Sequence, residues 1–330
     1  MRLRRQSLIW SDRSQFFHVV SRVVGRERVF GSVEKEVFVR MMRQQALFSG
    51  VEVLSYCVMS NHFHLLLHVP KRPDEKALGE EEILRRMKSY YGRKKMEQFM
   101  DELQELEIRE DQNGRRQFFE RIRRRMYSLS EFMKELKLRF SKWFNHQKER
   151  KGTLWEERFR CSLIEGSQKA LIAVSAYIDL NPIRAGMVKD PSEYRWSSHG
   201  AGIGGNRKAR EGLLRVMQTV EGPPIWANAL ENYRLYLHTK DSDMRTPEKG
   251  LLPSSGAVHG RDISYQSQLR QRLRYFTDGV VIGCREFVED ILKERGASIT
   301  KRKHQSGFPL KGGFPGSLMS LRNLRCDPKT

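Results

Sequence analysis

Two histidines separated by one residue are the clearest candidates for chemistry in this chain. His62 and His64 flank Phe63 within a short apolar run, HFHLLLHV. Residues two apart in a β-strand project to the same face, so the two imidazoles would form adjacent corners of a metal site while Phe63 anchors the strand in the core. A second interpretation stays open, in which both histidines are polar residues on a half-exposed strand. His68 shares their face and would then make it simply histidine-rich.

A tyrosine and an asparagine offer a second group of reactive atoms. Tyr177 and Asn181 are four residues apart in a predicted helix, so they lie on one helical face, one turn apart. The amide oxygen could complete a His-His-Asn ligand set, with the phenol beside it as a nucleophile. The alternative is that Tyr177 is a packed aromatic and that Asn181 ends the helix before Pro182. Spacing alone leaves both possibilities open.

The elements around the histidine pair predict a small α+β unit. β-Branched and aromatic residues indicate strands, and helical spacing of apolar residues indicates a helix whose N-cap would be Ser32 and which Gly50 would end. The two-residue break at Ser60 and Asn61 favours a β-hairpin. The predicted elements are strands at 15–24, 51–59 and 62–69 and a helix between the first two. This order predicts an antiparallel sheet with a helix on one face.

The rest of the chain divides by composition. Residues 71–127 are highly charged with little core-forming material, which predicts an inserted helical arm whose charged faces are mainly solvated. An amphipathic helix is predicted at 130–147, a strand within 152–165, a helix at 168–180 and a loop over 187–200. We expect a domain at 1–204 and, from 205 to 330, a basic, mostly helical extension with helices near 225–238 and 267–295 and a flexible tail.

Charge and cysteine usage narrow the class of protein. The formal net charge is +21, which favours nucleic acid as a partner. We find no apolar run long enough to span a bilayer and no signal peptide, so we expect a cytoplasmic protein associated with a bacterial nucleoid. The cysteines form no C-x-x-C pair, which argues against a zinc knuckle or a disulfide framework.

Several ordered motifs resemble one known family. YCVMSNHFHLLLHVP is similar to the HUH motif of the single-tyrosine transposases, and in particular of the REP-associated tyrosine transposases (RAYTs), with Ser60 where that family often has proline. The segments FFHVVSRVVGRERVF, WFNHQKERKGTLWEERFRCSLIE, AYIDLNPIRAGMV and YRWSS resemble further family blocks in the same order. The resemblance covers about residues 12–200, with 71–127 as an insertion.

The resemblance implies a fold and a reaction. The fold would be ferredoxin-like: an antiparallel sheet that carries the histidines, with packed helices and the tyrosine helix across it. Tyr177 would be the nucleophile of a single-stranded DNA endonuclease and strand transferase that acts on hairpin-forming repeats. His62, His64 and Asn181 would hold the metal ion, and His68 would not be a ligand. Phe140 stands where relatives often have tyrosine, and the tyrosines in or beside the insertion are weaker nucleophile candidates: Tyr90, Tyr91 and Tyr127.

The ligand set predicts a metal preference. Two imidazoles and an amide are neutral, so Mg²⁺ should bind weakly until a phosphate arrives, and Mn²⁺ should bind better. We expect Mg²⁺ in the cell and stronger activity or occupancy with Mn²⁺ in vitro. Arg158, Arg160 and Arg184 are candidate phosphate contacts. The protein would be a monomer or a homodimer, and two other functions stay open: a non-catalytic DNA- or RNA-binding regulator and a metal-dependent hydrolase in which water attacks.

Overall fold

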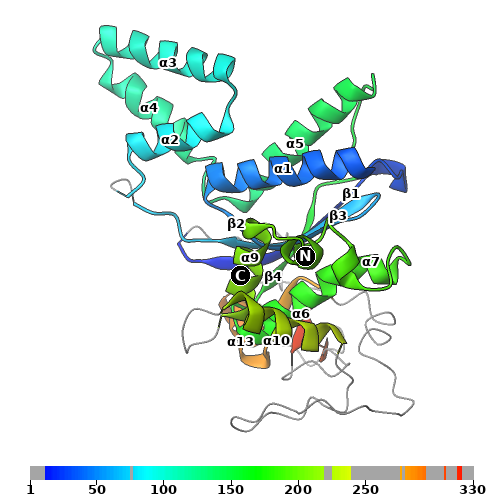
Figure 1. Cartoon of the computed structure of the whole chain (residues 1–330). Coiled ribbons are helices and arrows are strands. Elements are labelled where there is room, and N and C mark those ends of the chain that lie inside the picture. The colour runs from blue at the N-terminus through cyan, green and yellow to red at the C-terminus, as the bar shows by residue number, and fades with distance from the viewer. Residues whose placement is uncertain are drawn as a thin grey trace, which may run out of the picture.

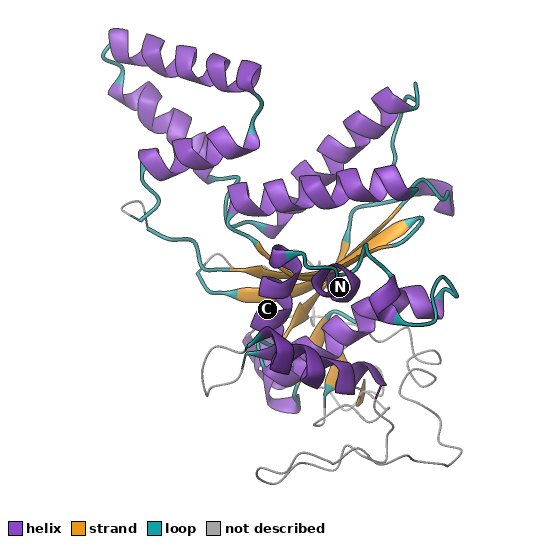
Figure 2. Cartoon of the chain, in the orientation of Figure 1, coloured by secondary structure: helices purple, strands orange, loops and turns teal. Residues whose placement is uncertain are grey.

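A mixed β-sheet with helices on both faces forms the body of the protein (Figures 1 and 2). The computed structural model describes residues 12–74, 77–218, 225–238, 276, 279–294, 308–309 and 318–321. Within these residues the sheet has seven strands in the order β2-β3-β1-β4-β5-β7-β6. The chain is therefore α+β, as the sequence predicts.

The first four strands form the ferredoxin-like part. They are β1 (Gln15–Arg22), β2 (Glu52–Val58), β3 (His62–Val69) and β4 (Arg160–Ile164). Each neighbouring pair among them is antiparallel. Helix α1 (Ser32–Ser49) connects β1 to β2, and α5 (Leu129–Gln147) precedes β4. This βαββαβ order, with β1 and β3 central, confirms the predicted ferredoxin-like topology.

The local turns follow the sequence signals, with one correction. The amide of Met59 donates to the carbonyl of His62 at 2.8 Å, which closes the predicted hairpin. Gly50 ends α1 with a φ of 72°, a left-handed conformation that glycine adopts without a Cβ clash. Ser32, however, is the first helical residue rather than the N-cap. Gly31 takes the cap position, and no side chain caps this helix end.

The two faces of the sheet have separate cores. We call the first the α1–α5 face, where Phe63 packs among Phe38, Phe140 and Trp155. The second is the α6 face, named for α6 (Gln168–Asp179), and its buried side chains include Leu66, Cys57 and Tyr177. Figure 1 shows α1 and α5 on one side of the sheet and α6 on the other. The alternation of β3 therefore separates Phe63 from its two neighbouring histidines.

Two helices on the α6 side were missed by the sequence patterns. The predicted loop over 187–200 contains η3 (Pro191–Glu193) and runs into α8 (Ser198–Ile203), which is followed by α9 (Arg207–Met217). The side chains of Ser197 and Asn206 cap these two helices by accepting bonds from backbone amides. Polar and glycine-rich residues that look like loop signals are in fact caps and closely packed glycines: Gly212 faces the backbone of Leu54.

The C-terminal extension adds three short strands to the sheet, which the sequence patterns did not predict, and one of them, β5, lies within the predicted helix at 267–295. β5 (Val281–Gly283) pairs in parallel with β4, so the sheet is not purely antiparallel. β7 (Met319–Leu321) and β6 (Phe308–Pro309) continue it. The described helices of the extension are α9, α10 (Trp226–His238) and α13 (Arg285–Glu294), so its described residues are mostly helical. Most of the predicted basic tail and the start of the predicted helix at 267–295 lie outside the described residues, and the boundary near 205 stays a prediction.

The insertion forms a helical arm with its own core. Its helices are α2 (Glu80–Tyr90), α3 (Arg93–Ile108) and α4 (Gln112–Arg123), which project away from the sheet beyond one end of α1 (Figure 1). The expectation of little core-forming material is wrong, because a compact apolar cluster joins these helices to Phe48 of α1. The members from the arm are mostly aromatic or long aliphatic, among them Tyr90, Phe99, Phe118 and Phe119.

Candidate active site

The two histidines of the HFH triplet lie together at the start of β3. Their ring centroids are 5.1 Å apart, and the rings meet edge to face. His64 is 2% exposed. His62 lies at the strand end and is partly exposed. The strand therefore presents one buried and one more accessible imidazole on the α6 face.

Helix α6 places Tyr177 against His64, the buried member of this pair. The ring centroids of Tyr177 and His64 are 5.8 Å apart, in an edge-to-face arrangement. The helix is apolar on nearly all sides and buried over most of its length, so its position against the sheet is fixed by packing. The structure thus brings together two elements that are more than a hundred residues apart in the chain.

Asn181 begins the short helix α7 (Asn181–Arg184), one turn beyond Tyr177. Its Nδ2 donates to the carbonyls of Tyr177 and Ile178, each at 3.1 Å. Because both bonds use the amide nitrogen, Oδ1 is turned away from the end of α6. The oxygen is the atom that a metal ion would use.

Arg184 lies against the predicted nucleophile. Its guanidinium lies 4.2 Å from the centroid of the Tyr177 ring, and its Nη2 donates to the Tyr177 carbonyl at 2.7 Å. A cation over an aromatic face is attracted by the ring quadrupole. Arg184 is thus held at the site, whereas Arg158 and Arg160 are exposed.

Two further basic residues flank the histidines through the register of the sheet. Val20 of β1 is paired with His64 on one side and with Arg160 on the other, so Arg160 shares the row and face of His64. Arg22 is paired with His62 two rows along, on the same face. Arg160 also donates to Glu157 at 2.6 Å. The sequence patterns missed Arg22, although its parity with the histidines follows from the pairing of the two strands.

His18 and Phe276 are site residues that the sequence reasoning did not identify. His18 of β1 is buried, and its Nε2 lies 3.0 Å from Nδ1 of His64. Its Nδ1 lies 3.1 Å from the carbonyl oxygen of Phe276, whose ring stacks on Tyr177 with centroids 4.4 Å apart. His18 could have been found from the sequence, because it is a histidine within a largely apolar strand. Nothing in the sequence indicated that Phe276 returns to this site.

Burial keeps the imidazoles neutral. It lowers the pKa of His62 to about 4, with the positive charges of Arg22 and Arg184 acting in the same direction. Burial also lowers the pKa of His18 to about 4, against the opposing effect of the Phe276 carbonyl. The pKa of His64 is lowered further, first by burial and then by its histidine neighbours. At neutral pH each ring therefore keeps a lone pair, the form that a metal ion requires.

A metal site beside the histidine pair would need at least one ligand that is not a histidine, a cysteine or a carboxylate. Among the residues that the structure describes, no three side chains of those types are grouped as metal ligands. Two neutral imidazoles with the amide oxygen of Asn181, the ligand set predicted from the sequence, would be a set of that kind. His68 is engaged elsewhere, since its Nδ1 bonds to Glu52 at 2.9 Å and its ring stacks on Phe16.

The other candidate tyrosines lie apart from the histidines. Tyr90, Tyr91 and Tyr127 belong to the core of the arm or pack against it. Phe140 lies on the α1–α5 face, the side of the sheet opposite Tyr177. Tyr177 is thus the tyrosine, within the described chain, that contacts the histidine pair.

A buried carboxylate on α6, that of Asp179, bonds this helix to its neighbours. Asp179 accepts bonds from the hydroxyl of Tyr233 at 2.7 Å and from the backbone amide of His199 at 3.1 Å. Burial raises the pKa of Asp179 to about 7, and the bond from Tyr233 opposes this rise. The network ties α6 to α8 and α10, and so holds the tyrosine helix in place.

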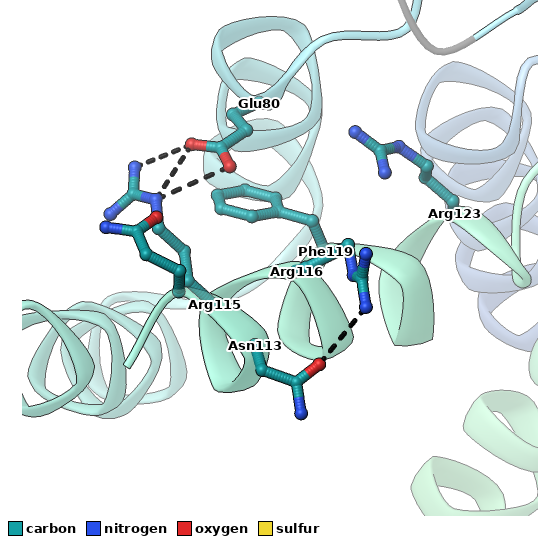
Figure 3. A pocket seen from close by; sticks show the side chains of 7 residues that line it. Glu80, Asn113, Arg115, Arg116, Phe119 and Arg123 are labelled. Carbon is teal, nitrogen blue, oxygen red and sulfur yellow. Dashed lines mark hydrogen bonds and ion pairs between the residues drawn. The ribbon is translucent and has the colours of Figure 1, made fainter. Parts of the chain in front are cut away.

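The arm contains a separate groove. It measures about 560 Å³ and is lined by Glu80 and residues of α4, including Phe119 and several arginines. Figure 3 shows Arg115 paired with Glu80 at one side and Arg116 bonded to Asn113. This groove lies in the insertion and holds none of the predicted catalytic residues.

Comparison with known proteins supports the resemblance seen in the motifs. Residues 13–120 match the model of a family described as "Transposase IS200 like", which confirms similarity to these transposases over the segment that carries His18, His62 and His64. The match ends before Tyr177. A solved structure described as "Structure of the REP associates tyrosine transposase bound to a REP hairpin" is 13% identical, covers 59% of this chain and 83% of that chain, and has a TM-score of 0.35. No curated protein matches.

The structure also bears on membranes. Over the described residues, none of the helices combines the length and the apolar character needed to cross a bilayer.

Proposed function

We propose that this protein is a transposase-type enzyme, a single-stranded DNA endonuclease and strand transferase that uses Tyr177 as its nucleophile and acts on hairpin-forming DNA. The observation that carries the proposal is the contact between Tyr177 and His64, whose ring centroids are 5.8 Å apart although they come from different elements. A packed aromatic alone would not need a buried, neutral histidine against it, next to a second neutral histidine.

The reaction follows from the chemistry of a phenol. Oη of Tyr177 attacks the phosphorus of a phosphodiester, a Tyr–O–P bond forms, and the bond from phosphorus to the 3′ oxygen breaks. The phenol loses a proton and the leaving oxygen gains one, which gives a 5′-phosphotyrosine and a free 3′-OH. The ester is exchanged rather than hydrolysed, so another 3′-OH can reverse the step. Covalent catalysis divides one difficult transfer into two easier ones.

His62, His64 and Asn181 would hold a divalent metal ion, Mg²⁺ in the cell or Mn²⁺ in vitro. Bound there, the ion would polarise the phosphate and offset the charge that develops on it. Arg184 would hold a phosphate oxygen beside the phenol, and its own position is fixed by the Tyr177 carbonyl. Arg22, Arg158 and Arg160 would contact the backbone on either side.

Binding of nucleic acid is supported by charge. The net charge of +21 would attract a phosphate backbone with strong salt dependence. The solved structure that shares similarity with this chain is described as bound to a REP hairpin, which makes hairpin DNA the first substrate to test.

A covalent-adduct assay tests the proposal. Hairpin single strands labelled at the 3′ end, which stays with the 5′-phosphotyrosine, are incubated with the protein and Mn²⁺, and the denatured products are examined for labelled protein. We expect an adduct with the wild type and with Tyr91→Phe, a matched control in the arm, but none with Tyr177→Phe. Native melting temperatures of both variants control for folding.

The same assay separates the two other functions. Binding without cutting by the wild type would support a non-catalytic DNA- or RNA-binding regulator and overturn the proposal. Cutting without an adduct, unchanged in Tyr177→Phe, would support a hydrolase in which water attacks and Tyr177 is structural.

A further inference from the structure

We propose that His18 and Asn61 are positioning residues that set the tautomers of His64 and His62, so that both histidines present Nε2 as a free donor atom. The inference deepens the proposed function, because it concerns how the same site is prepared for its ligand. Each positioning residue links one histidine to a backbone carbonyl, and the direction of every hydrogen bond follows from that fixed end.

The first of these chains of hydrogen bonds passes through the hairpin turn. Nδ2 of Asn61 donates to the carbonyl of Arg26 at 3.0 Å. A carbonyl only accepts, so this bond fixes which end of the Asn61 amide is the nitrogen. Oδ1 is therefore the atom that lies 2.7 Å from Nδ1 of His62. Because Oδ1 only accepts as well, Nδ1 of His62 must carry the proton and Nε2 keeps the lone pair.

The second chain runs through the first strand. The carbonyl oxygen of Phe276 lies 3.1 Å from Nδ1 of His18, so Nδ1 carries the proton. The neutral ring then has a bare Nε2, which lies 3.0 Å from Nδ1 of His64. Nδ1 of His64 must donate this bond, and its Nε2 is left with the lone pair. The two rings are nearly parallel, at 13°, so each lies close to the plane that this bond requires.

The two chains of hydrogen bonds lead to the same tautomer in both histidines, with the proton on Nδ1. One ends on Arg26, in the connection after β1, and the other on Phe276, in the C-terminal extension. Histidines that bind metals commonly donate their second N–H to a fixed acceptor, which sets the tautomer and orients the ring. The extension therefore supplies one of the two fixed ends of the catalytic site, which gives this region a role beyond extending the sheet.

The tautomers are measurable in the metal-free wild type without any substitution. In protein labelled with ¹⁵N-histidine at neutral pH, we expect His62 and His64 to show protonated Nδ1 and bare Nε2, with assignments from His62→Gln and His64→Gln. A protonated Nε2 on either histidine would overturn the proposal for that histidine. This measurement needs neither DNA nor activity, so it is separate from the test of the proposed function.

Two substitutions of His18 differ in the atom that they keep. The amide of His18→Gln can reach the position of Nε2 and accept from His64, whereas that of His18→Asn ends near the position of Nδ1 and loses this bond. We expect Mn²⁺ affinity, followed by electron paramagnetic resonance, to fall about 10–100-fold in His18→Asn, with His18→Gln substantially closer to the wild type. Asn61→Ala should show a similar loss through His62.

Three results would contradict the proposed role of His18. They are wild-type Mn²⁺ affinity in His18→Asn, equal losses of Mn²⁺ affinity in His18→Asn and His18→Gln, or an unchanged Nδ1–H signal of His64 in His18→Asn. If His18→Asn fails to fold, the tautomers of the wild type still decide. If the wild type forms no DNA adduct but shows the expected tautomers, the proposed reaction is wrong while the proposed role of His18 and Asn61 is still supported.

Discussion

The α6 face and the helical arm use polar residues in opposite ways. Around Tyr177, buried and partly buried polar side chains are joined in hydrogen-bond chains that end on backbone carbonyls, as His18 and Asn61 show. In the arm the charges pair at the surface, as Arg85 does with Glu82 and Arg121 with Glu102. Exposed pairs of this kind contribute about 0–1 kcal/mol each, because solvent screens them.

Charge density therefore does not locate the candidate site. The arm is rich in arginine, but many of its guanidiniums already have carboxylate partners, and its stability comes from an apolar cluster. The α6 face carries fewer charges but holds imidazoles whose lowered pKa keeps them neutral, beside the phenol of Tyr177. A buried polar group is costly unless it is bonded, so a set of them kept in one place indicates a function.

The largest expected effect comes from removing one buried imidazole of the pair. We expect His64→Gln to lower the rate of adduct formation roughly 10²- to 10⁴-fold, because loss of the bound ion removes several kcal/mol of charge stabilisation. His68→Gln, on the same strand face, and Arg115→Gln, in the arm, should keep the wild-type rate. The measurement is the initial rate of adduct formation at saturating Mn²⁺. Equal losses of rate in His64→Gln and His68→Gln would mean that the substitutions act by disturbing the strand and not by removing a metal ligand.

Two carboxylates sharpen the contrast through the pH dependence of stability, with opposite signs. Hydrogen bonds from Arg85 and Arg86 in the arm lower the pKa of Glu82 to about 2. Its contribution is present above the unfolded value near 4.5 and is lost as the pH falls toward 2. Burial raises the pKa of Asp179 to about 7. The folded state then binds the extra proton between about 3.8 and 7, so this contribution is lost as the pH rises through that range.

Urea unfolding at a series of pH values measures both effects. We expect Asp179→Asn to remove a loss of stability between about pH 4 and 7, and Glu82→Gln to remove a loss below about pH 4.5. The slope with pH is compared rather than the stability itself, since either substitution also changes hydrogen bonds. The assignment of signs would be wrong if Asp179→Asn made stability fall more steeply with rising pH.

Much of this contrast was predictable from the sequence, and the reasons for the rest are physical. Runs of β-branched and aromatic residues predicted β1 and the hairpin, and helical spacing of apolar residues predicted α1 and α6, because these segments are largely buried. The spacing of Tyr177 and Asn181 predicted a shared helical face but not its distance from the histidines, since that depends on how α6 packs. Phe276 was beyond reach because its contact spans 258 residues from His18. α9 was missed because its polar caps resemble loop signals.

The smallest expected effect separates the arginine at the site from those of the arm. Arg184→Gln removes a cation that lies 4.2 Å from the Tyr177 ring, and we expect it to reduce the slope of log affinity against log salt for a single strand by about 0.7, the value for one phosphate contact. Arg184→Lys keeps the charge and should keep the slope, which distinguishes loss of charge from a disturbed helix end. Arg121→Gln in the arm should leave the slope unchanged, because Arg121 is already paired with Glu102 at 2.8 Å. Filter binding at several salt concentrations gives all three slopes. A reduced slope in Arg121→Gln, with none in Arg184→Gln, would mean that the arm holds the DNA and that Arg184 serves only to fix the end of α6.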